Sequence, residues 1–141
     1  MHCRSTSPKE TRRFAAEVAT VIKPGTVLAL IGALGNGKTE FVRGFVAALS
    51  KEAGVCSPSF TLVNTYQTGA CEVHHFDFFR LNSRDELLEI GYYEYVNDPD
   101  AIVLIEWADR FPEVLPHHTR TIRFSLDNDE TVRIIDVEKE R

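Results

Sequence analysis

A glycine-rich segment that ends in lysine and threonine is the strongest chemical signal in the sequence. Residues 32–39 read Gly-Ala-Leu-Gly-Asn-Gly-Lys-Thr, a full match to the pattern G-x-x-x-x-G-K-[ST]. The glycines let the backbone turn tightly and direct N–H groups at phosphate oxygens, and a following helix adds the positive end of its dipole. Lys38 can reach the β- and γ-phosphates, and the Thr39 hydroxyl suits Mg²⁺. The segment predicts a P-loop that binds ATP, or a close purine relative, with Mg²⁺.

The predicted nucleotide contacts lie in this segment and directly after it. Lys38 is also expected to act in catalysis and Thr39 to coordinate the metal, while the next residue, Glu40, adds a negative charge near the phosphates. The predicted contacts are Gly32, Gly35, Asn36, Gly37, Lys38, Thr39 and Glu40.

Glu106 follows a second apolar run, the Ile-Val-Leu-Ile of residues 102–105. A P-loop needs an acidic partner that holds Mg²⁺ or its water ligands, usually at the end of such a strand. Glu106 is therefore predicted to be the metal-side carboxylate, acting through water and contributing to catalysis. The alternative is a solvated glutamate at a strand end, but the preceding run is typical of a buried strand.

Asp77 is a second candidate acid, within the His-Phe-Asp-Phe-Phe-Arg of residues 75–80. In a strand, alternation places His75, Asp77 and Phe79 on one face. An aspartate near the triphosphate could position the attacking water or take its proton. A structural pair with Arg80 is an alternative of equal weight, and His75 by itself is interpreted as a structural histidine.

Residues 57–61, Ser-Pro-Ser-Phe-Thr, follow the helix expected after the P-loop and are rich in hydroxyl groups. Many P-loop hydrolases have a nucleotide-sensing loop at this point, so Thr61 or Ser59 could sense the γ-phosphate. On these residues alone, a simple turn before a strand is the preferred interpretation.

The elements that must position these residues follow from periodicity and turn signals. An apolar run before the P-loop is typical of a strand buried on both faces, and an apolar stripe after it indicates a helix. Ser7, Pro8 and Glu10 form a helix start with a capping box. Gly91 should separate two short helical pieces. The expected strands are 27–31, 60–66, 73–79, 101–105, 121–126 and 131–137, and the P-loop helix is expected at about 38–49.

The strands at 60–66 and 73–79 are close enough to form a hairpin. The pattern therefore predicts an α/β fold. It is expected to be a P-loop NTPase-like three-layer α/β/α arrangement, with a mixed, mostly parallel sheet that includes an antiparallel hairpin.

Length and composition are those of an ordinary globular chain. The 141 residues fit a single domain, 1–141, with 43% hydrophobic and 26% charged residues. The net charge of −5 argues against broad nucleic-acid binding by this chain itself. Three cysteines without a C-x-x-C pair suit free thiols in a reducing cytoplasm. No apolar run approaches membrane-spanning length.

Taken in order, these motifs resemble the bacterial TsaE family, from about Thr11 to Trp107. The P-loop alone is common, but the ordered set is specific. The resemblance is carried by residues 32–39, 57–66 and 75–81, Gly91, and the Ile-Glu-Trp of residues 105–107.

The resemblance implies an ATPase with Mg²⁺ that is weak alone and works with the TsaB–TsaD pair. TsaD transfers the threonylcarbamoyl group to adenosine 37 of tRNA, and ATP turnover by TsaE is thought to reset that complex. Contact with tRNA would then be indirect, through the partners. The family's motif residues correspond here to Lys38, Thr39, Thr61, Asp77, Glu106 and Trp107. Thr61 is thereby added to the catalytic residues and Trp107 to the nucleotide contacts.

This chain departs from the family pattern at several positions. Ala33 replaces an acidic residue, Glu40 stands where a small or hydroxyl residue is common, Ser59 replaces threonine and Phe79 replaces tyrosine. None of these changes removes a group assigned to phosphate or Mg²⁺.

Two other functions are compatible with a P-loop. A small kinase needs an acceptor site and a lid that commonly carries several arginines, but Arg80 and Arg84 are the only arginines between Arg43 and Arg110. A non-catalytic, nucleotide-gated interaction module would bind ATP tightly without turnover, even with its partners present.

Overall fold

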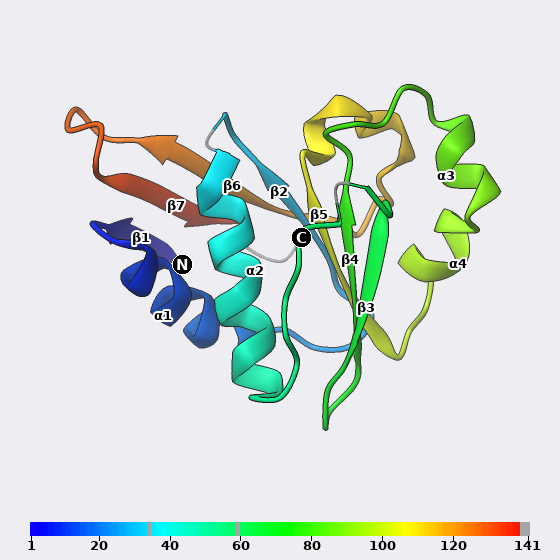
Figure 1. The fold of residues 1–141 in the computed structure, drawn as a ribbon, viewed down its shortest axis with the longest axis horizontal. Helices are drawn as coiled ribbons and strands as arrows, with labels where there is room; N and C mark the ends of the chain where they lie inside the picture. Colours follow the sequence, from blue (N-terminus) through cyan, green and yellow to red (C-terminus); the bar gives the residue numbers. More distant parts are fainter. Residues whose placement is uncertain (34, 59, 139–141) are drawn as a thin grey trace.

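One mixed sheet organises the chain in the computed structural model, which describes residues 1–33, 35–58 and 60–138. In this part of the chain seven strands lie in the order β1-β7-β6-β2-β5-β4-β3 (Figure 1). The strands are β1 (His2–Ser5), β2 (Val27–Ile31), β3 (Val63–Gln67), β4 (Glu72–Asp77), β5 (Ala101–Glu106), β6 (Arg120–Leu126) and β7 (Arg133–Val137).

Helices connect and cover these strands. The α-helices are α1 (Pro8–Ala19), α2 (Gly35–Leu49), α3 (Asp85–Glu89) and α4 (Tyr92–Val96). Two short 3₁₀ turns, η1 (Ala108–Arg110) and η2 (Pro112–Val114), follow β5. No helix in the described residues is both long and apolar enough to cross a membrane.

The centre of the sheet is parallel and its edges are antiparallel. β6, β2, β5 and β4 are parallel neighbours. β3 joins β4 as the predicted hairpin partner, and β7 and β1 extend the other edge antiparallel. The predicted mixed sheet with an antiparallel hairpin is therefore confirmed.

Two hydrophobic cores, one on each face of the sheet, produce the predicted three layers (Figure 1). Leu28 and Leu30 of β2 face α1 and α2, whereas Val27 and Ala29 face the layer that contains α3 and α4. This alternation follows from the period of two in a strand. Since both faces of β2 are covered, its sequence is an unbroken apolar run.

Several details differ from the sequence-based expectation. β4 ends at Asp77 rather than at residue 79, so Phe79 does not continue its strand face. β1 was not predicted, because its polar sequence gives no strand signal and it is held only by pairing with β7. α2 begins at Gly35, inside the motif, rather than near Lys38. β3 begins at Val63 rather than at residue 60. Leu62, directly before it, has a left-handed φ of 69°, which is incompatible with an extended strand. Ser7 caps α1 as predicted, with its Oγ accepting from the Glu10 N–H, but the Glu10 carboxylate accepts from the Thr6 N–H and does not complete a capping box with Ser7.

Candidate functional site

The glycine-rich motif connects the buried strand β2 to helix α2. Gly32 has φ of 138°, and a Cβ there would lie 2.2 Å from the carbonyl oxygen of Phe124 on β6. Only glycine satisfies both conditions, so the first motif position is fixed by backbone conformation and packing. Because α2 begins at Gly35, the end of the motif forms the N-terminal turn of a helix, where N–H groups favour anions. The predicted contact at the Asn36 side chain lies outside the described part of the structure.

Lys38 is fully buried at this turn. Its ammonium donates a hydrogen bond to the carbonyl of Gly32, and its Nζ lies 4.1 Å from the centre of the Trp107 ring. Burial lowers the Lys38 pKa, and the negative charges of Glu106, Asp109 and Asp77 oppose this shift. A buried cation at the N-terminal turn of a helix is suited to an anionic ligand, whereas the nearby acids would favour a cation beside that ligand.

Thr39 and Glu106 lie in direct contact. The Thr39 hydroxyl donates to Glu106 Oε1 at 2.8 Å. The other carboxylate oxygen, Oε2, lies 2.5 Å from His75 Nε2. Glu106 and His75 are both buried, so the carboxylate has a defined orientation. The two residues predicted to hold Mg²⁺ are thus brought together from α2 and β5.

Asp77 lies beside Glu106 at the carboxyl ends of adjacent parallel strands. The two residues are register partners in the β4–β5 pair. Asp77 is buried, and its Oδ1 accepts a hydrogen bond from the Phe79 N–H at 2.9 Å. Arg80, considered as its structural partner, is exposed and its guanidinium lies over the Phe60 ring at 4.5 Å.

Trp107 follows Glu106 in the left-handed conformation, with φ of 57°. A bulky residue seldom adopts this φ, and such strain is frequent at functional sites. The indole contacts both Lys38 and Phe79, and the ring centres of Trp107 and Phe79 are 5.0 Å apart. Trp107 therefore adjoins Lys38 of the candidate site, and its contact with a nucleotide stays a prediction.

Two predicted residues do not join this hydrogen-bonded cluster. Thr61 is exposed and donates to Asn64 at 3.1 Å, and its neighbour Ser59 lies outside the described residues. The carboxylate of Glu40 is bound by Arg12 at 2.6 Å and by Arg43 at 2.7 Å. These arginines neutralise the Glu40 carboxylate, so it presents little negative charge to a bound phosphate. Its predicted contact with the nucleotide stays a prediction.

The oxygen atoms at this point fit a magnesium ion. Mg²⁺ prefers hard oxygen donors and is usually held by one or two protein groups together with phosphates and water. The Thr39 hydroxyl and the Glu106 carboxylate converge, with the Asp77 carboxylate next in register. Within residues 1–33, 35–58 and 60–138, no group of three or more His, Cys, Asp or Glu side chains is placed to hold a metal ion.

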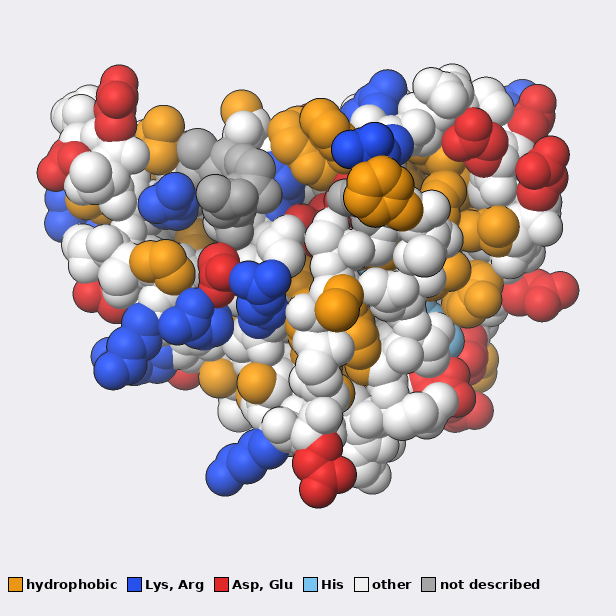
Figure 2. Space-filling model, in the orientation of Figure 1, with side chains coloured by type: hydrophobic (Ala, Val, Ile, Leu, Met, Phe, Trp, Pro, Cys, Tyr) orange, Lys and Arg blue, Asp and Glu red, His pale blue; other side chains and the backbone are white. Residues whose placement is uncertain are grey.

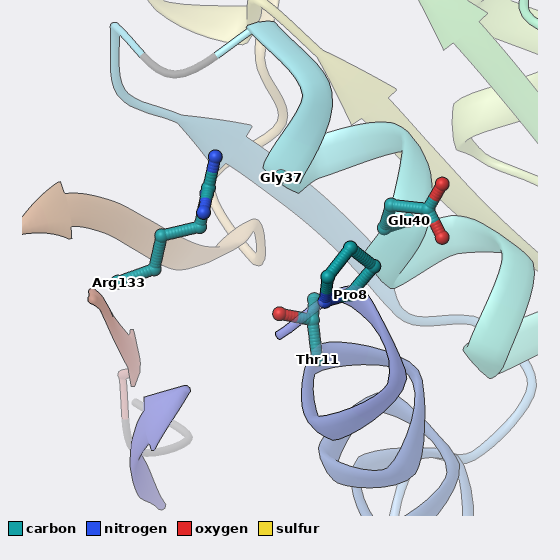
Figure 3. Close-up of a pocket in the computed structure, with 5 residues that line it drawn as sticks. All are labelled: Pro8, Thr11, Gly37, Glu40 and Arg133. Carbon is teal, nitrogen blue, oxygen red and sulfur yellow. The ribbon is translucent and has the colours of Figure 1, made fainter. Parts of the chain in front are cut away.

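A small pocket on the other side of the motif helix contains a residue that the sequence analysis missed. Figure 3 shows Arg133 of β7 extending toward the start of α2, with Pro8 and Thr11 of α1 below it. The pocket has a volume of about 30 Å³. Arg133 Nε is buried and has no acceptor among the described residues. No sequence signal marks Arg133, because it reaches the motif only through strand pairing.

His75 was also underestimated from the sequence. The strand alternation correctly placed it on the same face as Asp77, but its contact with Glu106 depends on the register between β4 and β5. The sequence did contain one signal for this role. His75 stands two positions before the candidate acid Asp77, so both side chains lie on the same face of the strand.

Comparison with known proteins identifies the family. The profile described as "Threonylcarbamoyl adenosine biosynthesis protein TsaE" matches residues 5–135. The chain belongs to the TsaE family. The TsaE protein of Treponema pallidum is 37% identical over 122 residues, which are 86% of this chain and 89% of the relative. The TsaE protein of Bacillus subtilis is 39% identical over 113 residues, 80% and 70% of the two chains.

A solved structure agrees with this assignment. The crystal structure of Bacillus subtilis YdiB matches with a TM-score of 0.75 and 32% identity, over 97% of this chain and 83% of that chain. The resemblance inferred from the motifs is confirmed, and the TsaE match extends beyond Trp107 into β7. In this chain, the part after Trp107 contains no motif that the sequence analysis singled out, so the resemblance was traced only as far as Trp107.

Proposed function

We propose that this TsaE-family chain binds ATP with Mg²⁺ and hydrolyses it as a subunit of the machinery that makes threonylcarbamoyladenosine in tRNA. The contact between Thr39 and Glu106, 2.8 Å long and adjacent to the buried Lys38, carries the proposal. It joins the motif helix to the strand-end carboxylate that P-loop hydrolases use on the metal side.

Each residue of the site has a role that its position supports. Lys38 supplies positive charge to the β- and γ-phosphates, beside the helix terminus that also favours them. Thr39 and Glu106 would hold Mg²⁺ directly or through water. When bound, the ion would neutralise charge that develops on the phosphate oxygens.

Asp77 is proposed to orient the attacking water and accept its proton. Its carboxylate is buried at the strand end next to Glu106, where a γ-phosphate held by Lys38 would be within reach. The Phe79 N–H bonds to Asp77 Oδ1 and so restricts its rotation. Thr61 is retained as a candidate sensor of the γ-phosphate, which would require the segment around it to move toward the site.

The partners in this proposal are TsaB and TsaD, with tRNA contacted through them. Turnover is expected to be weak in the isolated chain and to reset the TsaB–TsaD transferase between cycles. The net charge of −5 suits a subunit that leaves tRNA binding to others.

Phosphate release from ATP, measured with the chain alone and with its cognate TsaB and TsaD, tests this function. We expect stimulation by the partners and loss of turnover in Lys38→Ala and Glu106→Ala. Turnover that ignores the partners, or that survives the Lys38 substitution, would contradict the proposal. Tight ATP binding without turnover in the complete mixture would instead indicate a nucleotide-gated interaction module.

A further inference from the structure

His75 connects the candidate metal carboxylate to a second buried hydroxyl. Its Nε2 lies 2.5 Å from Glu106 Oε2, and its Nδ1 lies 3.1 Å from the hydroxyl of Tyr66 on β3. His75 is fully buried and Tyr66 nearly so. A buried imidazole with both nitrogens engaged has a fixed ring orientation, which a histidine that only fills space does not need.

The Tyr66 hydroxyl extends this connection to the main chain of Cys56. It donates to the Cys56 carbonyl at 2.9 Å and accepts from the Cys56 N–H at 3.3 Å. Asn64 Nδ2 donates to the same carbonyl at 3.0 Å. Cys56 immediately precedes the hydroxyl-rich residues 57–61, so the backbone at the start of that segment is held from β3.

The hydrogen bonds form one continuous series across three strands and a helix. It runs from Thr39 through Glu106, His75 and Tyr66 to Cys56. Its members come from α2, β5, β4 and β3, and the strands are neighbours in the sheet. The side chain of Glu106 cannot move far without disturbing His75, because Oε2 is already bound on that side.

We propose that His75 and Tyr66 are positioning residues that couple the metal-side carboxylate Glu106 to the backbone of Cys56. Through them, binding of ATP–Mg²⁺ at Thr39 and Glu106 changes how firmly the segment that begins at Cys56 is held. This coupling rests on the proposed nucleotide function, whereas the link between Tyr66 and Cys56 exists without a ligand.

Three variants test the link, which is the hydrogen bonding between Tyr66 and Cys56, separately from the coupling, which is its response to ATP–Mg²⁺. Tyr66→Phe removes only the hydroxyl and keeps the ring. His75→Gln keeps an amide donor for Glu106 but breaks the contact with Tyr66, and His75→Ala removes both contacts. Thr65→Val is the control, since Thr65 bonds to His74 at 2.9 Å in the same pair of strands but lies outside the series.

Hydrogen exchange of the peptide covering residues 56–62, followed by mass spectrometry, reports on the link. In the absence of nucleotide we expect exchange about three- to tenfold faster in Tyr66→Phe and His75→Gln than in the unmodified protein. Thr65→Val should exchange at the unmodified rate. In the unmodified protein, ATP–Mg²⁺ should change this exchange, and in both link variants the change should disappear.

Trp107 fluorescence during Mg²⁺ titration at fixed ATP reports on Glu106. Half-saturation should need roughly tenfold more Mg²⁺ in His75→Ala, because the carboxylate loses its supporting hydrogen bond. His75→Gln should remain close to the unmodified protein. If His75→Ala does not fold, Tyr66→Phe still tests the proposal.

Equal exchange at residues 56–62 in Tyr66→Phe and the unmodified protein would overturn the link. An equal effect of Thr65→Val would also overturn it, since a general weakening of the strand pair would then explain the result. If the unmodified protein shows no response to ATP–Mg²⁺, the proposed function fails and the coupling with it. The exchange rates without nucleotide would still decide the link.

Discussion

At the residue scale, the candidate site depends on the different contacts that the two carboxylate oxygens of Glu106 make. Oε1 accepts from Thr39 and Oε2 contacts His75, so the carboxylate plane is fixed from both sides. Burial makes each of these hydrogen bonds more valuable, since an unpaired carboxylate oxygen would have no water to replace the lost partner. A rigid acid placed beside Lys38 and Asp77 is what phosphoryl chemistry requires.

Replacing Thr39 by valine tests the metal-side assignment. Valine keeps the branched shape but removes the hydroxyl that faces Glu106. We expect ATP affinity in the presence of Mg²⁺ to fall about tenfold or more. A tenfold loss corresponds to roughly 1.4 kcal/mol of binding free energy. Isothermal titration calorimetry measures this change.

Thr39→Ser is the matched control for that substitution, because serine retains the hydroxyl. It should bind ATP–Mg²⁺ nearly as well as the unmodified protein. In EDTA the three proteins should bind ATP alike. An equal loss of affinity in EDTA would show that Thr39 supports the loop rather than the metal.

At the element scale, the site exists because strand ends meet. β2, β5 and β4 are adjacent and parallel, so their carboxyl ends lie at one edge of the sheet, where the glycine-rich motif, Glu106 and Asp77 are found. Helix α2 then positions Lys38 and Thr39 over this edge. Its placement depends on α1, which packs against its other side (Figure 1).

Gly44 sets the distance between these two helices. A Cβ there would lie 2.3 Å from the carbonyl oxygen of Arg12 and 2.5 Å from its Cα, both backbone atoms that cannot turn aside. We expect Gly44→Ala to lower the free energy of unfolding by about 1–3 kcal/mol, because α1 and α2 must move apart. Urea denaturation measures the loss.

Gly54→Ala is the control for that change, because a Cβ at Gly54 meets nothing within 4 Å. It should leave the unfolding free energy almost unchanged. Similar stability of the two alanine variants would show that the helix pair adapts more easily than its close packing indicates.

At the scale of the whole molecule, two cores of different chemistry share one sheet. The face covered by α1 and α2 carries the candidate site at its upper edge, and the opposite face contains the aromatic cluster around Phe76, Tyr92 and Tyr95. Figure 2 shows that acidic side chains gather over the α3–α4 side, whereas basic side chains lie over α1 and α2. On the face shown, charged side chains of the two signs are therefore unevenly distributed.

His74 should make the stability of the molecule depend on pH. It is buried on the α4 side, near Tyr95, Glu72 and Asp98. Burial lowers its pKa below the ordinary 6.5, and the two acids only partly oppose this shift. His74 in the unfolded chain then binds a proton more readily than His74 in the folded protein. The stability that neutral, buried His74 contributes is therefore fully present above about pH 6.5 and is lost as pH falls through the folded-state pKa of His74.

Chemical denaturation at pH 7.5 and pH 5.5 tests this dependence. The unmodified protein should lose more stability between these values than His74→Gln, which cannot titrate. An equal loss in both proteins would show that other groups account for the acid sensitivity.

The sequence by itself determined the local features of this protein. Glycine spacing, the apolar runs before Gly32 and Glu106, and the cap at Ser7 each depend on neighbouring residues, and the structure contains the elements they predict. The ordered motifs were also sufficient to indicate the TsaE family, which the match over residues 5–135 confirms.

Only the tertiary structure decided which of these residues meet. The sequence could not show that His75 joins Glu106 to Tyr66, that Arg133 reaches the motif helix, or that arginines neutralise Glu40. It also gave no sign of β1, whose polar residues are extended only because β7 offers them partners. These contacts join residues far apart in the chain, and they depend on strand register and helix packing rather than on local preference.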